Sequence, residues 1–158
     1  MAYLIFALRL ALGGLLVVAG ALKAHDGPIS TAVSIAGYRI LPQQLVAPLG
    51  IVLPYFEIML GAYLLAGLFS RIAGWIAALQ FAVFAVAVGS LVVRKIPADC
   101  GCFGSSVPTP PSWGHVGFDV LLVLGACAIA LRPPGAFALD QLLFPSSYFA
   151  SGRETASP

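Results

Sequence analysis

The segment IAGWIAALQFAVFAVAVGSLVV, residues 72–93, decides the fold class of this chain. It carries no charged residue, and Gln80 is its most polar side chain. At about 1.5 Å per residue in a helix, a run of this length crosses the ~30 Å hydrocarbon layer of a bilayer. Arg94 and Lys95 follow it at the level where a membrane helix meets the lipid headgroups. The segment therefore predicts a membrane-spanning helix.

The composition of the whole chain also indicates a membrane protein. Of its 158 residues, 60% are hydrophobic and 9% are charged, and the mean hydropathy is +1.00, whereas soluble domains carry about 25% charged residues. Eight basic and six acidic residues cannot form the polar shell of a soluble domain, so we expect the lipid bilayer to cover most of the surface. The net charge of +2 is small and the basic residues are scattered, so no nucleic-acid partner is expected.

Three further apolar runs give four predicted spans in total, at residues 3–22, 45–69, 72–93 and 113–131. Between the first two spans, residues 25–44 predict a short helix in the membrane interface, because Asp26 and Pro28 suit a helix start and apolar residues recur on one face. We expect an all-α integral membrane four-helix bundle over residues 1–135. An interfacial turn at 137–144 and a flexible tail are expected within residues 136–158.

Four spans place both termini on one side of the membrane. The 23–44 segment and the 94–112 loop then share the other side. The numbers of basic residues on the two sides are similar, so the charge pattern does not decide which side faces the cytoplasm.

The 94–112 loop contains Asp99-Cys100-Gly101-Cys102-Phe103-Gly104. A single glycine between two cysteines lets the backbone bend enough to join the sulfurs in a small, strained ring, and strained disulfides are readily reduced. We interpret Cys100 and Cys102 as a redox pair. The alternatives are two buried structural cysteines or a pair of metal thiolates, and metal is disfavoured because only His115 is near as a further ligand. Cys127 lies in an apolar run and is expected to pack there.

Polar residues on either side of the cysteines could influence their chemistry. His115 and Asp119 lie one helical turn apart at the start of the fourth span, and one interpretation is that His115 moves protons while Asp119 orients it. The other interpretation, which we slightly prefer, is that both are interfacial groups hydrogen-bonded within the bundle. Asp99 would oppose thiolate formation by its charge, so activation of a thiol is expected to come from elsewhere.

Arg9 and Glu57 lie well inside apolar runs, where an unpaired charge costs about 3 kcal/mol or more. Counted from the side of the termini, their depths differ by roughly 7 Å, a gap that an arginine side chain can bridge. We therefore predict an intramembrane ion pair between them, with a proton path or a ligand site as the alternative. Lys23 is expected to lie at the side of the cysteines and to snorkel toward the headgroups.

Several of these residues, taken in order along the chain, resemble the MauE family of DoxX-like membrane proteins, first named for methylamine utilisation. They are Arg9, Gly20-Ala21-Leu22-Lys23, Leu53-Pro54-Tyr55-Phe56-Glu57 and the 99–104 block. The resemblance covers residues 3–131. It implies a bundle distantly like DsbB and vitamin K epoxide reductase, in a bacterial inner membrane, which exchanges disulfide equivalents with an extracytoplasmic thioredoxin-like partner. On this resemblance, Cys100 and Cys102 would be the redox pair and their loop would be extracytoplasmic.

Two functional hypotheses follow. The first is a thiol–disulfide oxidoreductase, or an accessory to one, that acts on a thioredoxin-like partner or a client protein during maturation. Enzymes that pass thiol electrons to quinone normally use two cysteine pairs, and Cys127 is about 18 Å along the helix from His115, so single-pair exchange is expected and quinone is an optional cofactor. The second is a non-enzymatic subunit of a larger membrane complex, with the cysteine loop as a structural clasp. A weaker, third hypothesis is a ligand or quinone pocket lined by Arg9 and Glu57.

Overall fold

The described part of the chain is all-helical. The computed structural model describes residues 2–96, 98, 100–102, 104, 110–132 and 138–140. Its helices are α1 (Ala2–Asp26), α2 (Pro28–Gly37), α3 (Gln43–Ala66), α4 (Ser70–Arg94) and α5 (Trp113–Leu131). All except α2 are long and apolar enough to cross a membrane. The predicted all-α membrane bundle with four spans is therefore confirmed.

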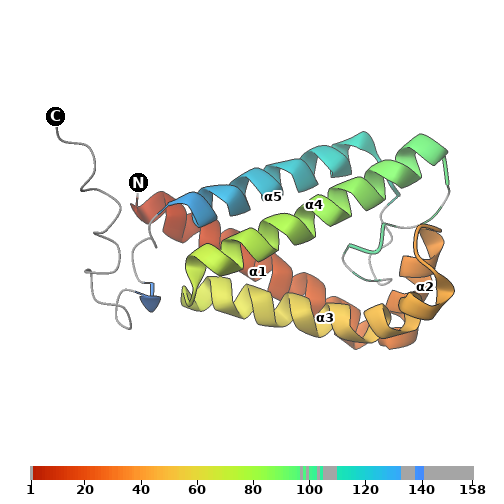
Figure 1. Ribbon diagram of the computed structural model, residues 1–158, viewed down its shortest axis with the longest axis horizontal. Helices are drawn as coiled ribbons and strands as arrows, with labels where there is room; N and C mark the ends of the chain where they lie inside the picture. The colour runs from red at the N-terminus through yellow and green to blue at the C-terminus, as the bar shows by residue number, and fades with distance from the viewer. Residues whose placement is uncertain are drawn as a thin grey trace.

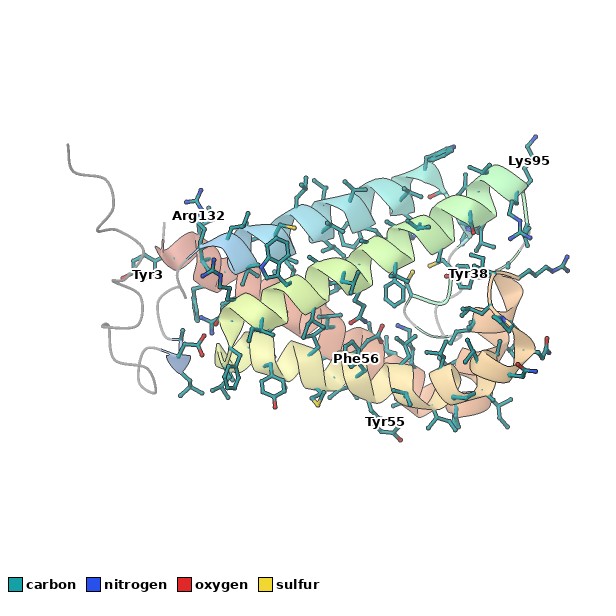
Figure 2. All side chains as sticks on the ribbon, viewed as in Figure 1. Tyr3, Tyr38, Tyr55, Phe56, Lys95 and Arg132 are labelled. Carbon is teal, nitrogen blue, oxygen red and sulfur yellow. The ribbon has the colours of Figure 1, made fainter. Side chains whose placement is uncertain are left out.

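Each predicted span coincides with one long helix, and the differences lie at the helix ends. α1 continues to Asp26, four residues beyond the predicted end, and α3 begins and ends two to three residues early. Figure 1 shows α2 and the α4–α5 connection at the end of the bundle opposite the N-terminus. Lys95 and Arg132 mark these two ends (Figure 2). Of the predicted C-terminal turn and tail, only residues 138–140 lie within the described residues.

The bundle is built from two closely packed helix pairs, α1 with α3 and α4 with α5. Gly13 and Gly61 bring α1 and α3 together, because a Cβ atom on Gly61 would lie 2.6 Å from the carbonyl oxygen of Gly13. In a membrane, where helices gain no hydrophobic energy from association, such close backbone contact supplies much of the packing energy. The α1–α3 pair is therefore held at a distance that leaves no room for a side chain at these positions.

The core occupies the region where the two helix pairs meet. Cys127 packs against it from α5, as expected from its place in an apolar run. Large apolar side chains such as Leu79 and Leu121 point outward instead, which suits a surface that faces lipid rather than water. The buried apolar residues of the core are Ile5, Leu12, Leu16, Leu60, Leu64, Ala73, Ala77, Ala78, Phe81, Ala126 and Ile129.

The first residues of α4 are capped by a side chain that is distant in sequence. Asp140 is buried, and its carboxylate accepts hydrogen bonds from the backbone N–H groups of Phe69 (2.6 Å) and Ser70 (2.8 Å). A carboxylate at this position satisfies unpaired N–H groups and complements the positive end of the helix dipole. Asp140 thereby attaches the segment after α5 to the α3–α4 turn.

We expect Gly61→Ala to lower the unfolding free energy by about 1–3 kcal/mol, because its new methyl group meets the backbone of α1. Thermal or denaturant unfolding of the purified protein in detergent measures the change. Gly14→Ala is the matched control, since a Cβ atom there meets nothing within 4 Å. Equal stability of the two variants would contradict the close packing of α1 on α3.

Candidate functional site

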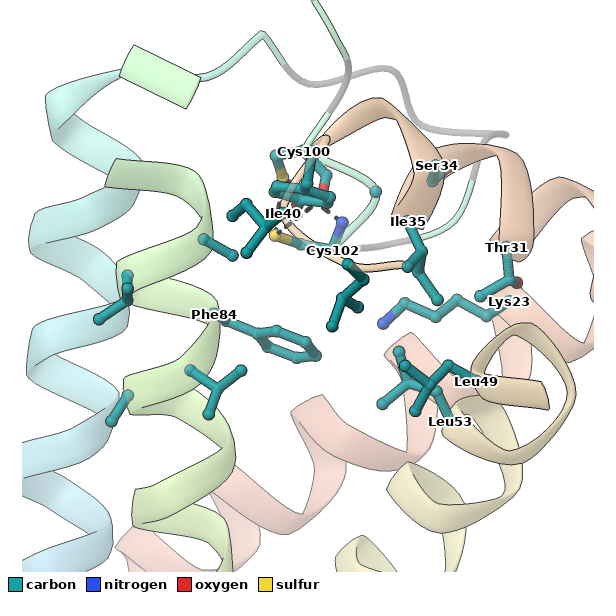
Figure 3. A pocket seen from close by; sticks show the side chains of 17 residues that line it. Lys23, Thr31, Ser34, Ile35, Ile40, Leu49, Leu53, Phe84, Cys100 and Cys102 are labelled. Carbon is teal, nitrogen blue, oxygen red and sulfur yellow. Dashed lines mark hydrogen bonds between the residues drawn. The ribbon is translucent and has the colours of Figure 1, made fainter. Parts of the chain in front are cut away.

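The structure brings Cys100 and Cys102 together. Their Sγ atoms lie 2.7 Å apart in the reduced state (Figure 3). Gly101 between them has φ +61°, and a Cβ atom on it would lie 2.9 Å from Cβ of Ser34 in α2. Only glycine fits both the turn and this close approach. Because a disulfide bond is about 2.05 Å long, oxidation of the pair would require little movement of the sulfurs.

The segment around Cys100–Cys102, which we call the cysteine loop, is attached to the helices through Tyr38, at the end of α2 (Figure 2). The Tyr38 hydroxyl donates a hydrogen bond to the carbonyl oxygen of Cys100. Its own carbonyl oxygen accepts a hydrogen bond from Nη1 of Arg94, at 3.0 Å. Burial raises the pKa of Tyr38, so its hydroxyl stays protonated and remains a donor. The sequence offered no signal for this role beyond a tyrosine in an interfacial segment.

The two thiols differ in exposure. Cys100 is 2% exposed, whereas Cys102 is partly exposed. The backbone N–H of Cys102 points to the sulfur of Cys100, at 3.4 Å. The hydrogen bond between the two thiols, together with burial, raises the pKa of Cys102. Cys102 is therefore the more accessible sulfur, and it needs a proton acceptor to become a nucleophile near neutral pH.

A cavity of about 460 Å³ lies beneath the cysteine loop, between α2, α3 and α4 (Figure 3). Its walls are almost entirely apolar, and the side chain of Lys23 extends along one side. Both cysteines reach it. The remaining lining residues are Thr31, Ser34, Ile35, Tyr38, Ile40, Leu41, Leu49, Leu53, Ala82, Val83, Phe84, Val86, Ala87 and Gly101.

The predicted ion pair between Arg9 and Glu57 is wrong. Glu57 pairs with Lys23 instead, whose Nζ lies 2.8 Å from each carboxylate oxygen. Nε2 of Gln80 donates a third hydrogen bond to Glu57, at 3.2 Å, and Nζ of Lys23 lies 5.4 Å from the ring centre of Phe84. Lys23 is thus buried and paired with Glu57. The expectation that it extends to the lipid headgroups is wrong. The cluster joins α1, α3 and α4.

Arg9 finds its partners at the end of α3. Its Nε donates to the carbonyl oxygen of Leu64 at 3.0 Å, and its Nη2 donates to that of Leu65 at 3.3 Å. The last carbonyl groups of a helix have no partner within the helix and carry the negative end of its dipole. Leu64 lies seven residues, or about 10 Å, from Glu57 along α3, so these carbonyl groups are the nearer acceptors for Arg9.

The polar residues at the start of α5 are not arranged so that Asp119 orients His115. Nδ1 of His115 lies 3.0 Å from Oγ of Ser112, and no hydrogen bond joins His115 to Asp119. Ser112 is the N-cap residue of α5 and lies in the same turn as His115. Its hydroxyl group, rather than Asp119, therefore forms the hydrogen bond with the His115 ring. Asp119 is 7% exposed, and its Oδ2 has no hydrogen-bond partner among the described residues. Both residues nevertheless face a small cavity with Cys102.

One predicted residue cannot be placed, because Asp99 lies outside the described residues. Within the described parts of the chain, no three His, Cys, Asp or Glu side chains are grouped as they would be in a metal site. The residues that the structure assembles near the cysteine loop are thus Cys100, Cys102, Tyr38, His115 and Asp119, with Lys23 and Glu57 below them.

The Lys23–Glu57 pair leads to a stability prediction. We expect Lys23→Met and Glu57→Gln each to lower the unfolding free energy by about 3–5 kcal/mol, because each change leaves the other buried charge without its partner. The double variant should lose less unfolding free energy than the two single variants lose together, which corresponds to a coupling energy of about 1 kcal/mol or more. Denaturant unfolding in detergent gives all four values. In a control cycle, Arg9→Met and Glu57→Gln should be additive; coupling there, and none with Lys23, would refute the observed pairing.

The comparisons with known proteins agree on one family. The family model described as methylamine utilisation protein MauE matches residues 1–132. The MauE protein of Methylorubrum extorquens is 28% identical over 119 residues, which cover 75% of this chain and 64% of the relative. That of Methylophilus methylotrophus is 34% identical over 99 residues (61% and 50%), and that of Paracoccus denitrificans is 32% identical over 103 residues (65% and 55%).

The chain spans about half to two thirds of the length of these curated relatives. No solved structure matches it. The family model extends from the start of α1 to the residue after α5 and so includes all four membrane helices and the cysteine loop. The chain therefore belongs to the MauE family of methylamine utilisation proteins.

Proposed function

We propose that this multi-pass membrane protein exchanges thiol and disulfide equivalents through Cys100 and Cys102 and acts in methylamine utilisation. The observation that carries the proposal is the contact between the two reduced sulfurs, 2.7 Å apart, in a loop at one end of the bundle. The loop conformation holds both sulfurs within reach of a disulfide bond, and Tyr38 fixes the loop to the helices. A client undergoing maturation, or a thioredoxin-like protein, would be the partner.

The exchange proceeds in two substitutions at sulfur. The thiolate of Cys102, the more exposed sulfur, attacks a partner disulfide, forms a mixed disulfide and releases one partner thiolate. The sulfur of Cys100 then attacks Cys102, which closes the Cys100–Cys102 disulfide and releases the second partner thiolate. Two electrons pass to the partner, and the two thiol protons end on its sulfurs. The reverse sequence oxidises the partner. Because protein disulfides persist in oxidising compartments, we place the loop on the extracytoplasmic side.

Redox titration of the purified protein tests this function. We expect Cys100 and Cys102 to interconvert between dithiol and disulfide as the potential of a thiol buffer is varied, with alkylated mass as the readout. Cys127→Ser should titrate as the wild type does, because Cys127 packs against the core. Cys100→Ser should leave Cys102 able to trap a partner as a stable mixed disulfide.

A pair that stays reduced or stays linked across the whole range would instead favour a non-enzymatic subunit with a structural clasp. Labelling of intact cells with a membrane-impermeant thiol reagent, with and without reductant, reports the side of the membrane on which the loop lies. Labelling only after cell lysis would contradict the extracytoplasmic placement.

The apolar cavity supports a second, dependent proposal, that a lipid-soluble quinone binds beside the dithiol. A volume of about 460 Å³ with apolar walls falls in the usual range for small-molecule sites. The residues fit such a ligand: the two cysteines line the cavity, and Lys23 contributes a polar group. A bound quinone supplies an acceptor for two electrons and two protons. The protein would then hold the thiols of Cys100 and Cys102 against the cavity, and α2 would shield the cavity from bulk water.

A side chain that fills the cavity tests the proposed quinone site. We expect Ala87→Phe to slow oxidation of the reduced pair by a quinone in liposomes about tenfold or more, because the new ring occupies the cavity. Oxidation of the same variant by a water-soluble disulfide should be unchanged. Leu79→Phe, on an outward-facing part of α4, is the control. Equal quinone rates in both variants would exclude this site.

A further inference from the structure

A small cavity lies behind Cys102, where all four membrane helices approach the cysteine loop. Its volume is about 30 Å³, enough for one or two water molecules. Its polar lining comes from Cys102, Glu57, His115 and Asp119. The apolar lining residues are Leu15, Leu16, Ala19, Phe81, Phe84, Phe118 and Leu122.

Asp119 is the member of this group whose hydrogen bonding is incomplete. Its side chain is more than nine-tenths buried, and its Oδ2 has no partner among the described residues. A buried carboxylate oxygen without a hydrogen-bond partner is energetically unfavourable. A water molecule in the adjoining cavity would supply the missing hydrogen bond, and the cavity offers the two or more polar groups that an ordered water needs.

Glu57 and His115 are less suited to accept a proton from Cys102. Both carboxylate oxygens of Glu57 are held by Lys23, and one of them also accepts from Gln80. The His115 ring bonds to Ser112 and is partly exposed. Of the cavity's acidic and basic side chains, only Asp119 therefore combines burial with an acceptor atom that has no partner among the described residues.

We propose that a water molecule in this cavity links Asp119 to Cys102 and that Asp119 is the proton acceptor through which Cys102 becomes a thiolate. The inference rests on the proposed thiol–disulfide exchange. The S–H proton passes to the water, and a proton of the water passes to Oδ2 of Asp119. One carboxylate and one thiol become one carboxylic acid and one thiolate, so the charge of the site stays constant and no second buried negative charge is created.

Asp119 takes up the proton through the water and does not itself touch the reacting sulfur. The proton can later leave through His115, which lines the same cavity and is partly exposed. The titratable groups that face Asp119 from the surrounding elements also set its behaviour. They are Cys100 and Cys102 in the loop, Tyr38 after α2, Glu57 on α3, which is paired with Lys23, and His115 on α5.

The pH profile of thiol reactivity tests this role. The reduced full-length protein in detergent is reacted with glutathione disulfide from about pH 6 to 10, and formation of the mixed and internal disulfides is followed by mass. We expect Asp119→Asn to slow the reaction about tenfold or more near neutral pH, as general-base assistance is lost. The difference should close at high pH, where hydroxide removes the thiol proton directly. Asp119→Glu should restore part of the neutral-pH rate.

Three results would overturn the inference. Asp119→Asn with the wild-type profile would show that no proton passes to Asp119. A loss by the same factor at every pH, not rescued by Asp119→Glu, would assign Asp119 a structural role. A loss near neutral pH in His115→Gln, but not in Asp119→Asn, would make His115 the acceptor. A wild-type protein that fails to react at any pH would refute the proposed function itself, which separates the two failures.

Discussion

The hydrogen-bonded ion pair between Lys23 and Glu57 is the interaction on which the functional end of the bundle depends. An isolated charge at this depth would be expensive, but the two charges neutralise each other at 2.8 Å and Gln80 satisfies a further bond. The pair therefore fixes α1 and α3 in register and connects them to α4. Lys23 then forms part of the large cavity, while Glu57 forms part of the small one. Both cavities that adjoin the dithiol are thus positioned by one buried contact.

The opposite end of the bundle is closed by a different kind of electrostatic contact. Arg9 binds the last carbonyl groups of α3, and Asp140 binds the first N–H groups of α4. Both contacts use the backbone groups that helices leave unpaired at their ends, so the α3–α4 turn is fixed from two sides. From this turn the two helices diverge toward the cysteine loop (Figure 1). The bundle is therefore closed at the α3–α4 turn and more open at the cysteine loop because of where the buried charged side chains find partners.

Much of the fold could be predicted from the sequence because lipid imposes a simple constraint, a long apolar run for each span. The contact between Cys100 and Cys102 was equally predictable, since one glycine separates them. The partner of Glu57 could not be predicted in this way. Comparing the depths of charged residues considers only side chains as partners, so it paired Arg9 with Glu57 and missed the backbone carbonyl groups that Arg9 binds instead. Asp140 and Tyr38 were missed for a related reason: each acts on backbone atoms that lie distant in sequence.

The two cavities give the dithiol two surroundings of opposite character. The larger one is apolar and bordered by helices that face lipid, whereas the smaller one contains a carboxylate oxygen without a hydrogen-bond partner in the described part of the chain. A dithiol that is oxidised must release two electrons and two protons, and protons are the more difficult to move through an apolar site. If the pair undergoes exchange, separating the polar cavity from the apolar one lets protons leave Cys102 without bringing water into the lipid-facing side. In the proposed exchange, the loop would contact the partner protein, and Asp119 and His115 on α5 would carry the proton.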